Sequence, residues 1–395
     1  MGFDDRKARS MTDLVDDDPL MPDALEVAAE LDARFAETGK LVGPLHGVVM
    51  AIKDAFDTFD MRTTSGADAF YANDRPPDDS TVVKRLRKAG AIILAKANLS
   101  EYQNGQPRSS FGGTYCNPYD TEREAGISSG GSGIAVAANL VTCAIAEESG
   151  SSIRGPAKAN NTVGISATRE LVSADGMIQQ GIVTRGGPIC RTVADAARVL
   201  DVYAGYDPKD ELTAFSVGRM PSQPYQRFTR VEKKKPLRKV RIGVVREYMD
   251  KDLFTIADSE TIDIIDIAIN DLRGLGATII DPGPHGALFQ DCVDKYVPVW
   301  RNQLFISQFP EPGFFPVGDD HIPLLVDMFL DPLLVPHTAT GQPSIRNLGP
   351  AAGIGDARFN FNWYLKERGD ANIHSLTDLI RRRISLLTLL RSRIS

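Results

Sequence analysis

The sequence has no run of eighteen uninterrupted apolar residues, so it offers no candidate for a membrane-spanning helix. Its acidic first twenty residues lack the hydrophobic core that a signal peptide requires. The five histidines form no HxxxH pair, and the four cysteines form no CxxC pair. The cysteines are Cys116, Cys143, Cys190 and Cys292. We therefore expect a cytoplasmic protein with reduced thiols that does not span a membrane and uses no metal or organic cofactor.

An excess of positive charge is also missing. The 45 Lys and Arg residues are outnumbered by 52 Asp and Glu residues, which gives a net charge of −7. Proteins that bind phosphate backbones usually present a basic surface, so we expect no nucleic-acid partner. The one basic run, Lys233 to Arg241, includes Pro236 and separates two periodic segments. We interpret it as a solvated linker.

Short apolar runs alternate with amphipathic helical patterns along the chain. The predicted helices are Ala24–Ala36, which follows a turn-like Pro22-Asp23, the segment from the N-cap Ser80 to Gly90, and Ser259–Leu275; the predicted strands are Gly47–Lys53, Ala91–Ala95, Val141–Ala146, Val240–Val245 and Ala277–Ile280. This alternation predicts an α/β fold in which helices cover a central mixed sheet, as one large α/β/α domain. We place an N-terminal tail at 1–21, the domain at 22–380 with its catalytic core at 43–200, and an atypical tail at 381–395.

Residues 105–190 are rich in Gly, Ser, Asn and Thr and contain two clusters. The first, Gly126 to Gly133, precedes a small-residue helix for which Ser132 is the expected N-cap. The second, Ser149 to Pro156, follows a predicted strand and the acidic pair Glu147-Glu148. Glycine beside serine at a strand end lets the backbone aim several N–H groups at one point, as an oxyanion hole requires.

Each cluster taken alone has other interpretations. A Gly/Ser-rich segment is usually only a loop, and the first cluster lacks the lysine of a phosphate-binding P-loop. Residues Gly126 to Gly130 also match G-x-S-x-G, the nucleophile elbow of α/β-hydrolases, in which Ser128 would be the nucleophile. That chemistry needs a histidine further along the chain, and His321, His337 and His374 are available.

The two clusters together with an upstream lysine resemble the amidase signature family. The carrying motifs are SSGGSG from Ser128, Ser152-Ile-Arg154-x-Pro156-Ala157, GPLHGVVMAIKD from Gly43, GAIILAKANLSEY from Gly90, and GGPICRTVADAARVL from Gly186. They occur in the family's order over about residues 22–290. Two positions depart from the family pattern: Ile127 replaces a small residue, and Ser151 stands where glycine is commonest.

The resemblance implies a Ser-Ser-Lys triad. Lys53 would be the buried base, Ser128 the bridging serine behind a cis peptide, and Ser152 the nucleophile. The oxyanion hole would consist of the N–H groups of Ser149, Gly150, Ser151 and Ser152. A lysine base must be neutral, and lowering its pKa from about 10.4 to about 7 corresponds to about 4 kcal/mol, which burial can supply. We interpret Arg154 and Glu148 as an ion pair that supports the loop.

The predicted function is therefore that of an amidase, which hydrolyses the carbon–nitrogen bond of a small linear amide through an acyl-enzyme. Acyl amides, aryl amides and carbamates all remain candidate substrates, and the substrate-binding residues are not assigned. One alternative is a glutamine amidotransferase subunit that delivers ammonia to a partner. Another is a non-catalytic, amidase-like scaffold.

The C-terminal segment RRRISLLTLLRSRIS differs in composition from the preceding chain. We expect a truncated end that leaves the family's fold incomplete, and a short amphipathic helix is the alternative interpretation. An incomplete core would expose apolar edges, which favours an oligomer such as a homodimer.

Overall fold

The computed structural model describes residues 22–69, 71–73, 75–103, 105–178, 181, 183–230, 235–252, 256–284, 286–288, 327–328, 331–334 and 354–384. The chain divides into two compact units. One contains residues 1–230 and 354–395, and the other contains residues 231–353. The boundary at residue 231 falls beside the basic run that we interpreted as a linker.

A five-stranded mixed sheet forms the centre of the first unit, in the order β3-β1-β6-β8-β7. Its strands are β1 (Val49–Lys53), β3 (Ile92–Ala97), β6 (Cys143–Glu148), β7 (Val163–Gly164) and β8 (Arg185–Cys190). Strand β1 lies parallel to both β3 and β6, whereas β8 runs antiparallel to β6 and to β7. The α/β class and the mixed sheet predicted from the alternating pattern are therefore confirmed.

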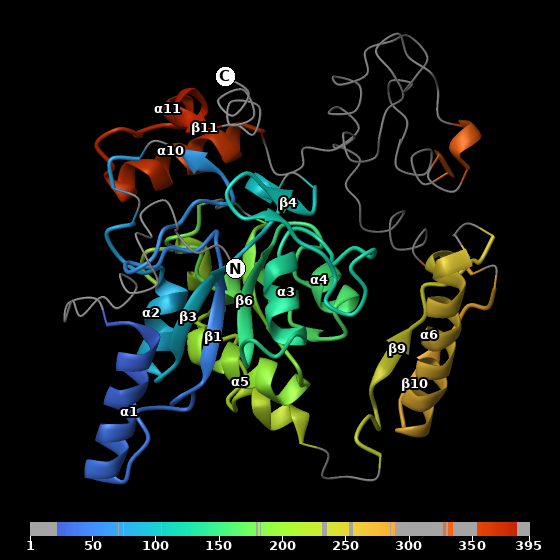
Figure 1. The fold of residues 1–395 in the computed structure, drawn as a ribbon. Coiled ribbons are helices and arrows are strands. Elements are labelled where there is room, and N and C mark those ends of the chain that lie inside the picture. The colour runs from blue at the N-terminus through green and yellow to red at the C-terminus, as the bar shows by residue number, and fades with distance from the viewer. Residues whose placement is uncertain are drawn as a thin grey trace. The chain divides into compact units, whose positions relative to one another are not determined.

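Helices cover both faces of this sheet (Figure 1). Because side chains alternate along a strand, Met50 and Ile52 of β1 face one layer and Ala51 faces the other. The first layer is formed by α2 (Thr81–Lys88) and α5 (Val193–Tyr203). The second contains α3 (Gly130–Ala137), whose small residues pack on Ala51 and on the alanines of β6.

The first two helices begin where the local sequence indicates. Helix α1 (Ala24–Thr38) begins after Asp23, whose Oδ1 accepts hydrogen bonds from the N–H groups of Leu25 and Glu26. Helix α2 begins after the predicted N-cap Ser80, whose Oγ accepts a hydrogen bond from the N–H group of Val83 at 3.4 Å. Both starts were therefore predictable from local sequence.

The predicted N-cap of the third helix is wrong. Helix α3 begins after Ser129 rather than after Ser132, and the buried Ser132 hydroxyl donates to the carbonyl oxygen of Ile145 at 3.2 Å. The earlier start depends on Gly131, whose N–H donates to the Asn98 carbonyl at 3.0 Å. A Cβ on Gly131 would lie 2.3 Å from that oxygen, so the glycine allows the helix to begin against the end of β3.

The expectation of reduced thiols is wrong for two of the four cysteines. A disulfide joins Cys143 of β6 to Cys190 of β8. The two residues are direct partners in the antiparallel ladder, and their Cα atoms lie 4.4 Å apart. They are separated by 47 positions, so the cysteine spacing gave no sign of the pair. Cys116 is free and exposed, and Cys292 lies outside the described residues.

A C-terminal segment returns to the first unit (Figure 1). It contains α10 (Ile354–Arg368), α11 (Leu376–Arg382) and β11 (Arg383–Ile384), which pairs antiparallel with β2 (Asp68–Ala69). Tyr364 of α10 is buried and donates to Asp57 Oδ1 at 2.7 Å. Residues 385–395, most of the predicted atypical tail, lie outside the described residues, so the two interpretations of that tail stay open.

The second unit contains a two-stranded parallel sheet beside one long helix. Its elements are β9 (Arg241–Gly243), α6 (Ile256–Gly274) and β10 (Thr278–Ile280), which match the predicted strand, helix and strand. Arg246 contacts Asp266 at 3.0 Å and Asp281 at 2.9 Å, and so ties the helix to the strand that follows it.

The remaining described elements of the chain are short. They are α4 (Arg154–Ala159), β4 (Arg108–Ser109), β5 (Gly113–Thr114) and the 3₁₀ helices η2 (Glu101–Gln103), η3 (Arg169–Leu171), η4 (Glu211–Ser216), η5 (Tyr225–Thr229), η6 (Arg246–Tyr248) and η8 (Pro332–Leu334).

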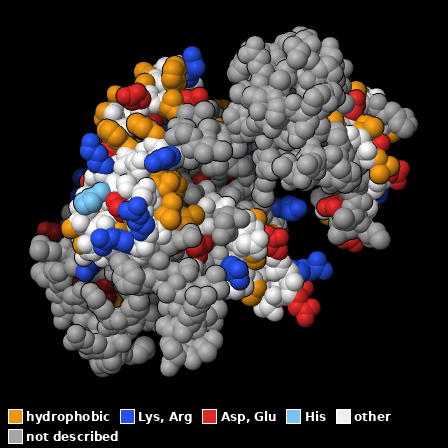
Figure 2. Space-filling model, turned by 90° about the horizontal axis from the view of Figure 1, so that it is seen from above, with side chains coloured by type: hydrophobic (Ala, Val, Ile, Leu, Met, Phe, Trp, Pro, Cys, Tyr) orange, Lys and Arg blue, Asp and Glu red, His pale blue; other side chains and the backbone are white. Residues whose placement is uncertain are grey.

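Charges of both signs occur on the described part of the face drawn in Figure 2, where they are interspersed with hydrophobic side chains. That part presents no continuous basic surface. Among the described helices, none combines the length and the apolar character needed to cross a membrane.

Candidate active site

The two central parallel strands bring charged side chains to one edge of the sheet. Lys53 is the last residue of β1, and Glu147 and Glu148 are the last residues of the neighbouring β6. Parallel neighbours end at the same edge of a sheet, so these side chains meet although they are far apart in sequence. All three residues are fully buried.

The side-chain nitrogen of Lys53 lies among three oxygen atoms. Lys53 Nζ donates to Ser128 Oγ at 2.8 Å, to Glu147 Oε2 at 2.8 Å and to the Glu147 carbonyl oxygen at 3.2 Å. The peptide bond between Ile127 and Ser128 is cis, as the resemblance implied. The structure therefore brings together Lys53 and Ser128, two of the three predicted catalytic residues.

Burial and charge act in opposite directions on Lys53. Removal from water disfavours the ammonium form and lowers the pKa of Lys53 below its ordinary value, while the negative charges of Glu147 and Glu148 oppose that shift. Burial is the larger effect, so the pKa of Lys53 moves in the direction that a lysine base needs.

Close packing of glycine brings the two Gly/Ser clusters side by side. Gly126 adopts a φ of 75°, which side chains other than glycine rarely tolerate. A Cβ on Gly126 would lie 2.6 Å from the backbone nitrogen of Pro156. Any other residue at this position would push apart the segment that carries Ser128 and the segment that carries Ser152.

Ser152 lies in the loop between β6 and α4 and is half-buried. Among the described residues, no hydrogen bond joins Ser152 to Ser128. The N–H groups of Gly150, Ser151 and Ser152 also have no hydrogen-bond acceptor among the described residues. These donors, which belong to the predicted oxyanion hole, are therefore free to bind a ligand.

Glu148 holds this loop in place. Its Oε2 accepts from the N–H groups of Ile153 and Arg154 at 3.1 and 3.2 Å. Its Oε1 accepts from Arg154 Nε at 3.1 Å, Arg185 Nη2 at 2.8 Å and Ser166 Oγ at 2.8 Å. Burial raises the pKa of Glu148, but the hydrogen bonds outweigh burial and bring the pKa below its ordinary value. The predicted Glu148–Arg154 ion pair is confirmed.

Sequence reasoning missed the contact between Glu147 and Lys53. The acidic pair was visible, but only Glu148 was assigned a partner. The available signal was that Glu147 ends the strand that neighbours the strand of Lys53. Glu147 also connects to the loop, because Ser149 Oγ lies 3.4 Å from its Oε1 and 2.8 Å from Thr184 Oγ1.

The nucleophile-elbow interpretation of Ser128 is disfavoured. A nucleophile elbow exposes its serine, whereas Ser128 is only 2% exposed and contacts Lys53. His321 and His337 lie outside the described residues. His374 is described: its backbone N–H donates to Asp378 Oδ2 at 3.2 Å, and among the described residues no hydrogen bond joins its side chain to Ser128.

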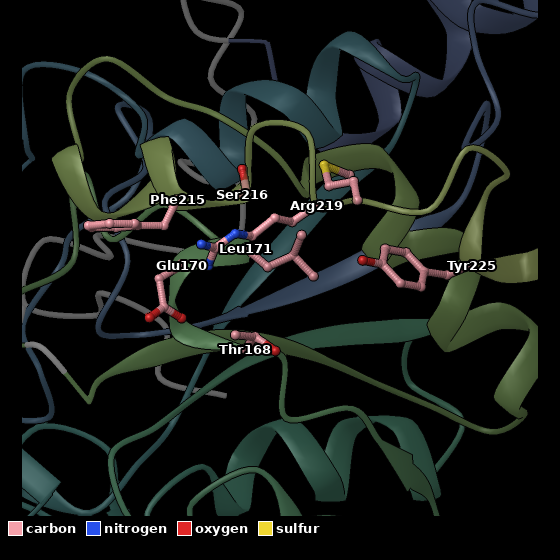
Figure 3. Close-up of a pocket in the computed structure, with 8 residues that line it drawn as sticks. Thr168, Glu170, Leu171, Phe215, Ser216, Arg219 and Tyr225 are labelled. Atoms are coloured by element: carbon pink, nitrogen blue, oxygen red, sulfur yellow. The ribbon is translucent and has the colours of Figure 1, made fainter.

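Two cavities among the described residues are lined by none of the predicted site residues. One, of about 300 Å³, lies among η3, η4 and η5; in Figure 3, Arg219 extends toward Glu170 while Tyr225 lies on the other side of Leu171. The other, of about 460 Å³, includes Asp57 and Arg368. These cavities therefore do not identify the substrate-binding residues.

Among the described residues, no group of three or more His, Cys, Asp or Glu could hold a metal ion.

Known proteins are similar to this chain in sequence. The chain is 37% identical over 261 residues to a glutamyl-tRNA(Gln) amidotransferase subunit of Heliobacterium modesticaldum, covering 65% of this chain and 50% of that relative. It is 39% identical over 241 residues to the protein of the same name from Pseudomonas aeruginosa, covering 60% and 47%. The chain thus spans about half the length of these curated relatives.

A solved structure is similar to this chain in fold. The native peptide amidase of Stenotrophomonas maltophilia superposes with a TM-score of 0.65 at 30% identity, covering 94% of this chain and 63% of that one. Residues 18–298, most of the chain, match the family model described as Amidase. The order of the motifs, the mixed sheet and these similarities lead to one conclusion: the chain belongs to the amidase family.

Proposed function

We propose that this chain hydrolyses linear amides with Ser152 as nucleophile, Ser128 as proton relay and Lys53 as base. The observation that carries the proposal is the buried contact of 2.8 Å between Lys53 Nζ and Ser128 Oγ. Burial disfavours the charged form of Lys53, and lysines with perturbed pKa values gather at functional sites.

In the proposed reaction, neutral Lys53 accepts the proton of Ser128 while Ser128 takes the proton of Ser152. Ser152 Oγ attacks the amide carbonyl carbon, and the tetrahedral intermediate expels the amine, which receives the relayed proton. A water molecule, deprotonated by the same relay, then hydrolyses the Ser152 ester and releases the acid. The logic is that of a Ser-His-Asp triad with a lysine as the base.

The negative oxygen of the intermediate needs hydrogen-bond donors that are already in place. The free N–H groups of Gly150, Ser151 and Ser152, with that of Ser149, are suited to this role. Glu148 supports them, because its bonds to the N–H groups of Ile153 and Arg154 fix the loop immediately after Ser152. In this scheme the ion pairs of Glu148 are structural.

The proposal is tested by a hydrolysis screen of the purified chain over short acyl amides, aryl amides, carbamates, esters and C-terminal peptide amides. We expect turnover of at least one amide, and loss of that turnover in Ser152→Ala. The matched control is Ser110→Ala, which removes a hydroxyl bonded to Glu101 outside the proposed site. A folded protein with no turnover in any class would instead support a non-catalytic scaffold.

The names of the relatives favour a second candidate, a subunit that hydrolyses glutamine and transfers ammonia within a complex. These relatives carry the name of an amidotransferase component, and they share 37% and 39% identity with this chain. Such a component would release glutamate from glutamine only when its partner subunits are present. A glutaminase assay of the chain with and without the partner subunits of a relative separates the two candidates.

A further inference from the structure

Glu147 supplies two of the three oxygen atoms around the Lys53 amine. The carboxylate Oε2 lies 2.8 Å from Nζ, the carbonyl oxygen of the same residue lies 3.2 Å away, and Ser128 Oγ completes the set at 2.8 Å. An ammonium group has three N–H donors, so this set of acceptors satisfies it completely.

The same arrangement also suits the neutral amine. A neutral amine keeps two N–H groups and one lone pair. If the two N–H groups remain on the oxygens of Glu147, the lone pair is left for the Ser128 hydroxyl. Glu147 therefore restricts the basic lone pair to the direction of the proton that it has to accept.

Among the described residues, Glu147 and Glu148 supply the charges that act on the pKa of Lys53. Glu148 adjoins it on β6 and is bonded to Arg154 of α4 and Arg185 of β8. Lys96 of β3 is buried, forms an ion pair with Asp54 at 3.4 Å, and bonds to the Phe56 and Arg62 carbonyl oxygens and to Thr63. Helix α3, which begins two residues after Ser128, has no charged side chain.

On these grounds we propose that Glu147 is a positioning residue that aims Lys53 at Ser128 and sets the pH at which Lys53 becomes a base. The proposal rests on the proposed function, because it assigns Lys53 the role of base. It adds a fourth residue to the proposed Ser-Ser-Lys triad, and it assigns to that residue the acidic limb of the pH–rate profile.

Two substitutions separate the effect of the Glu147 charge from the effect of the position of its carboxylate oxygen. Glu147→Gln keeps an oxygen acceptor in place but removes the negative charge that favours the ammonium form. We expect the rising limb of kcat/KM to move to lower pH by about 1–3 units. Glu147→Asp keeps the charge but draws the oxygen back, so we expect a lower kcat with a limb closer to that of the native chain.

The experiment is a pH–rate profile of amide hydrolysis for the native chain, Glu147→Gln, Glu147→Asp and Glu122→Gln. Glu122 is exposed, so Glu122→Gln makes the same chemical change away from the site and should leave the profile unchanged. The proposal is overturned if the rising limb of the kcat/KM profile of Glu147→Gln stays at the native pH or moves to higher pH. If Ser152→Ala hydrolyses amides as fast as the native chain, the proposed function fails instead.

A thermal unfolding cycle tests the pair without activity. We expect Lys53→Met and Glu147→Gln together to lower the melting temperature by less than the sum of the two separate changes, because each single variant leaves one buried group unpaired. The cycle applies even where Glu147→Gln folds poorly, since Lys53→Met should then restore folding. If the two decreases in melting temperature add, or if Lys53→Met does not restore the folding of Glu147→Gln, the pairing on which the proposal depends is overturned.

Discussion

Two consecutive glutamates at the end of β6 occupy different chemical settings. The Glu147 carboxylate contacts the buried Lys53, whereas the Glu148 carboxylate is shared by Arg154 and Arg185. Both glutamate side chains are fully buried, so burial does not distinguish them.

The difference lies in what their partners can do. A lysine in an apolar site can lose its proton near neutral pH, whereas an arginine stays charged. In the proposed reaction, the Glu147 pair can therefore change its protonation, while the Glu148 pairs stay charged near neutral pH and are suited to holding a loop. The type of the basic partner thus separates a chemical role from a structural one.

The largest expected effect comes from removing the basic partner of Glu147. We expect Lys53→Ala to lower kcat/KM for amide hydrolysis by about 10²–10⁴-fold, the usual contribution of a positioned base. Lys53→Arg sharpens the comparison, because it keeps a positive charge beside Glu147 but cannot supply a neutral base. It should be as inactive as Lys53→Ala. A rate within a few-fold of the native chain in either variant would rule out a lysine base.

A smaller effect, on stability, is expected from removing Glu148. Glu148→Ala leaves the N–H groups of Ile153 and Arg154 without their acceptor and Arg185 without its ion-pair partner. We expect the free energy of unfolding to fall by about 3 kcal/mol in a denaturant titration. Arg154→Ala is the matched control: its side chain is 60% exposed, so it should cost about 1 kcal/mol or less. Equal losses in the two variants would contradict this ranking.

The smallest expected effect is a dependence of stability on pH. The pKa of Glu148 is lower in the folded protein than its ordinary value of about 4.3. The folded state therefore prefers the charged form, and this stabilisation is complete above about pH 4.3 and is lost as the pH falls through the lowered folded pKa. Denaturant titrations between pH 7 and pH 3 should show that the free energy of unfolding falls less with acid in Glu148→Gln than in the native chain. If the free energy of unfolding falls equally in both proteins, the titration of Glu148 is not the cause of the fall.

Local sequence predicted the starts of two helices and the strand that carries Lys53. Ser80 caps its helix as expected, the first helix starts directly after the turn-like Pro22-Asp23, and the apolar run before Lys53 forms a central strand, because these features depend on neighbouring residues. Ser132 was misassigned as a cap because the start of α3 is set by its contact with Asn98, which is remote in sequence.

The missed parts of the site depend on strand pairing. Lys53 and Glu147 meet only because β1 and β6 are parallel neighbours, and Cys143 meets Cys190 only because β6 and β8 are antiparallel neighbours. Motif order identified Lys53, Ser128 and Ser152 as a set. Motif order could not indicate that Glu147 contacts the amine of Lys53.

In the proposed mechanism, Ser152 is the nucleophile and Ser128 is the buried relay. The most direct test is to label the native chain with a fluorophosphonate probe and locate the adduct by peptide mass spectrometry. We predict an adduct on Ser152 that forms faster as the pH rises and is absent in Ser152→Ala. An adduct on Ser128, or labelling that persists in Ser152→Ala, would contradict the assignment.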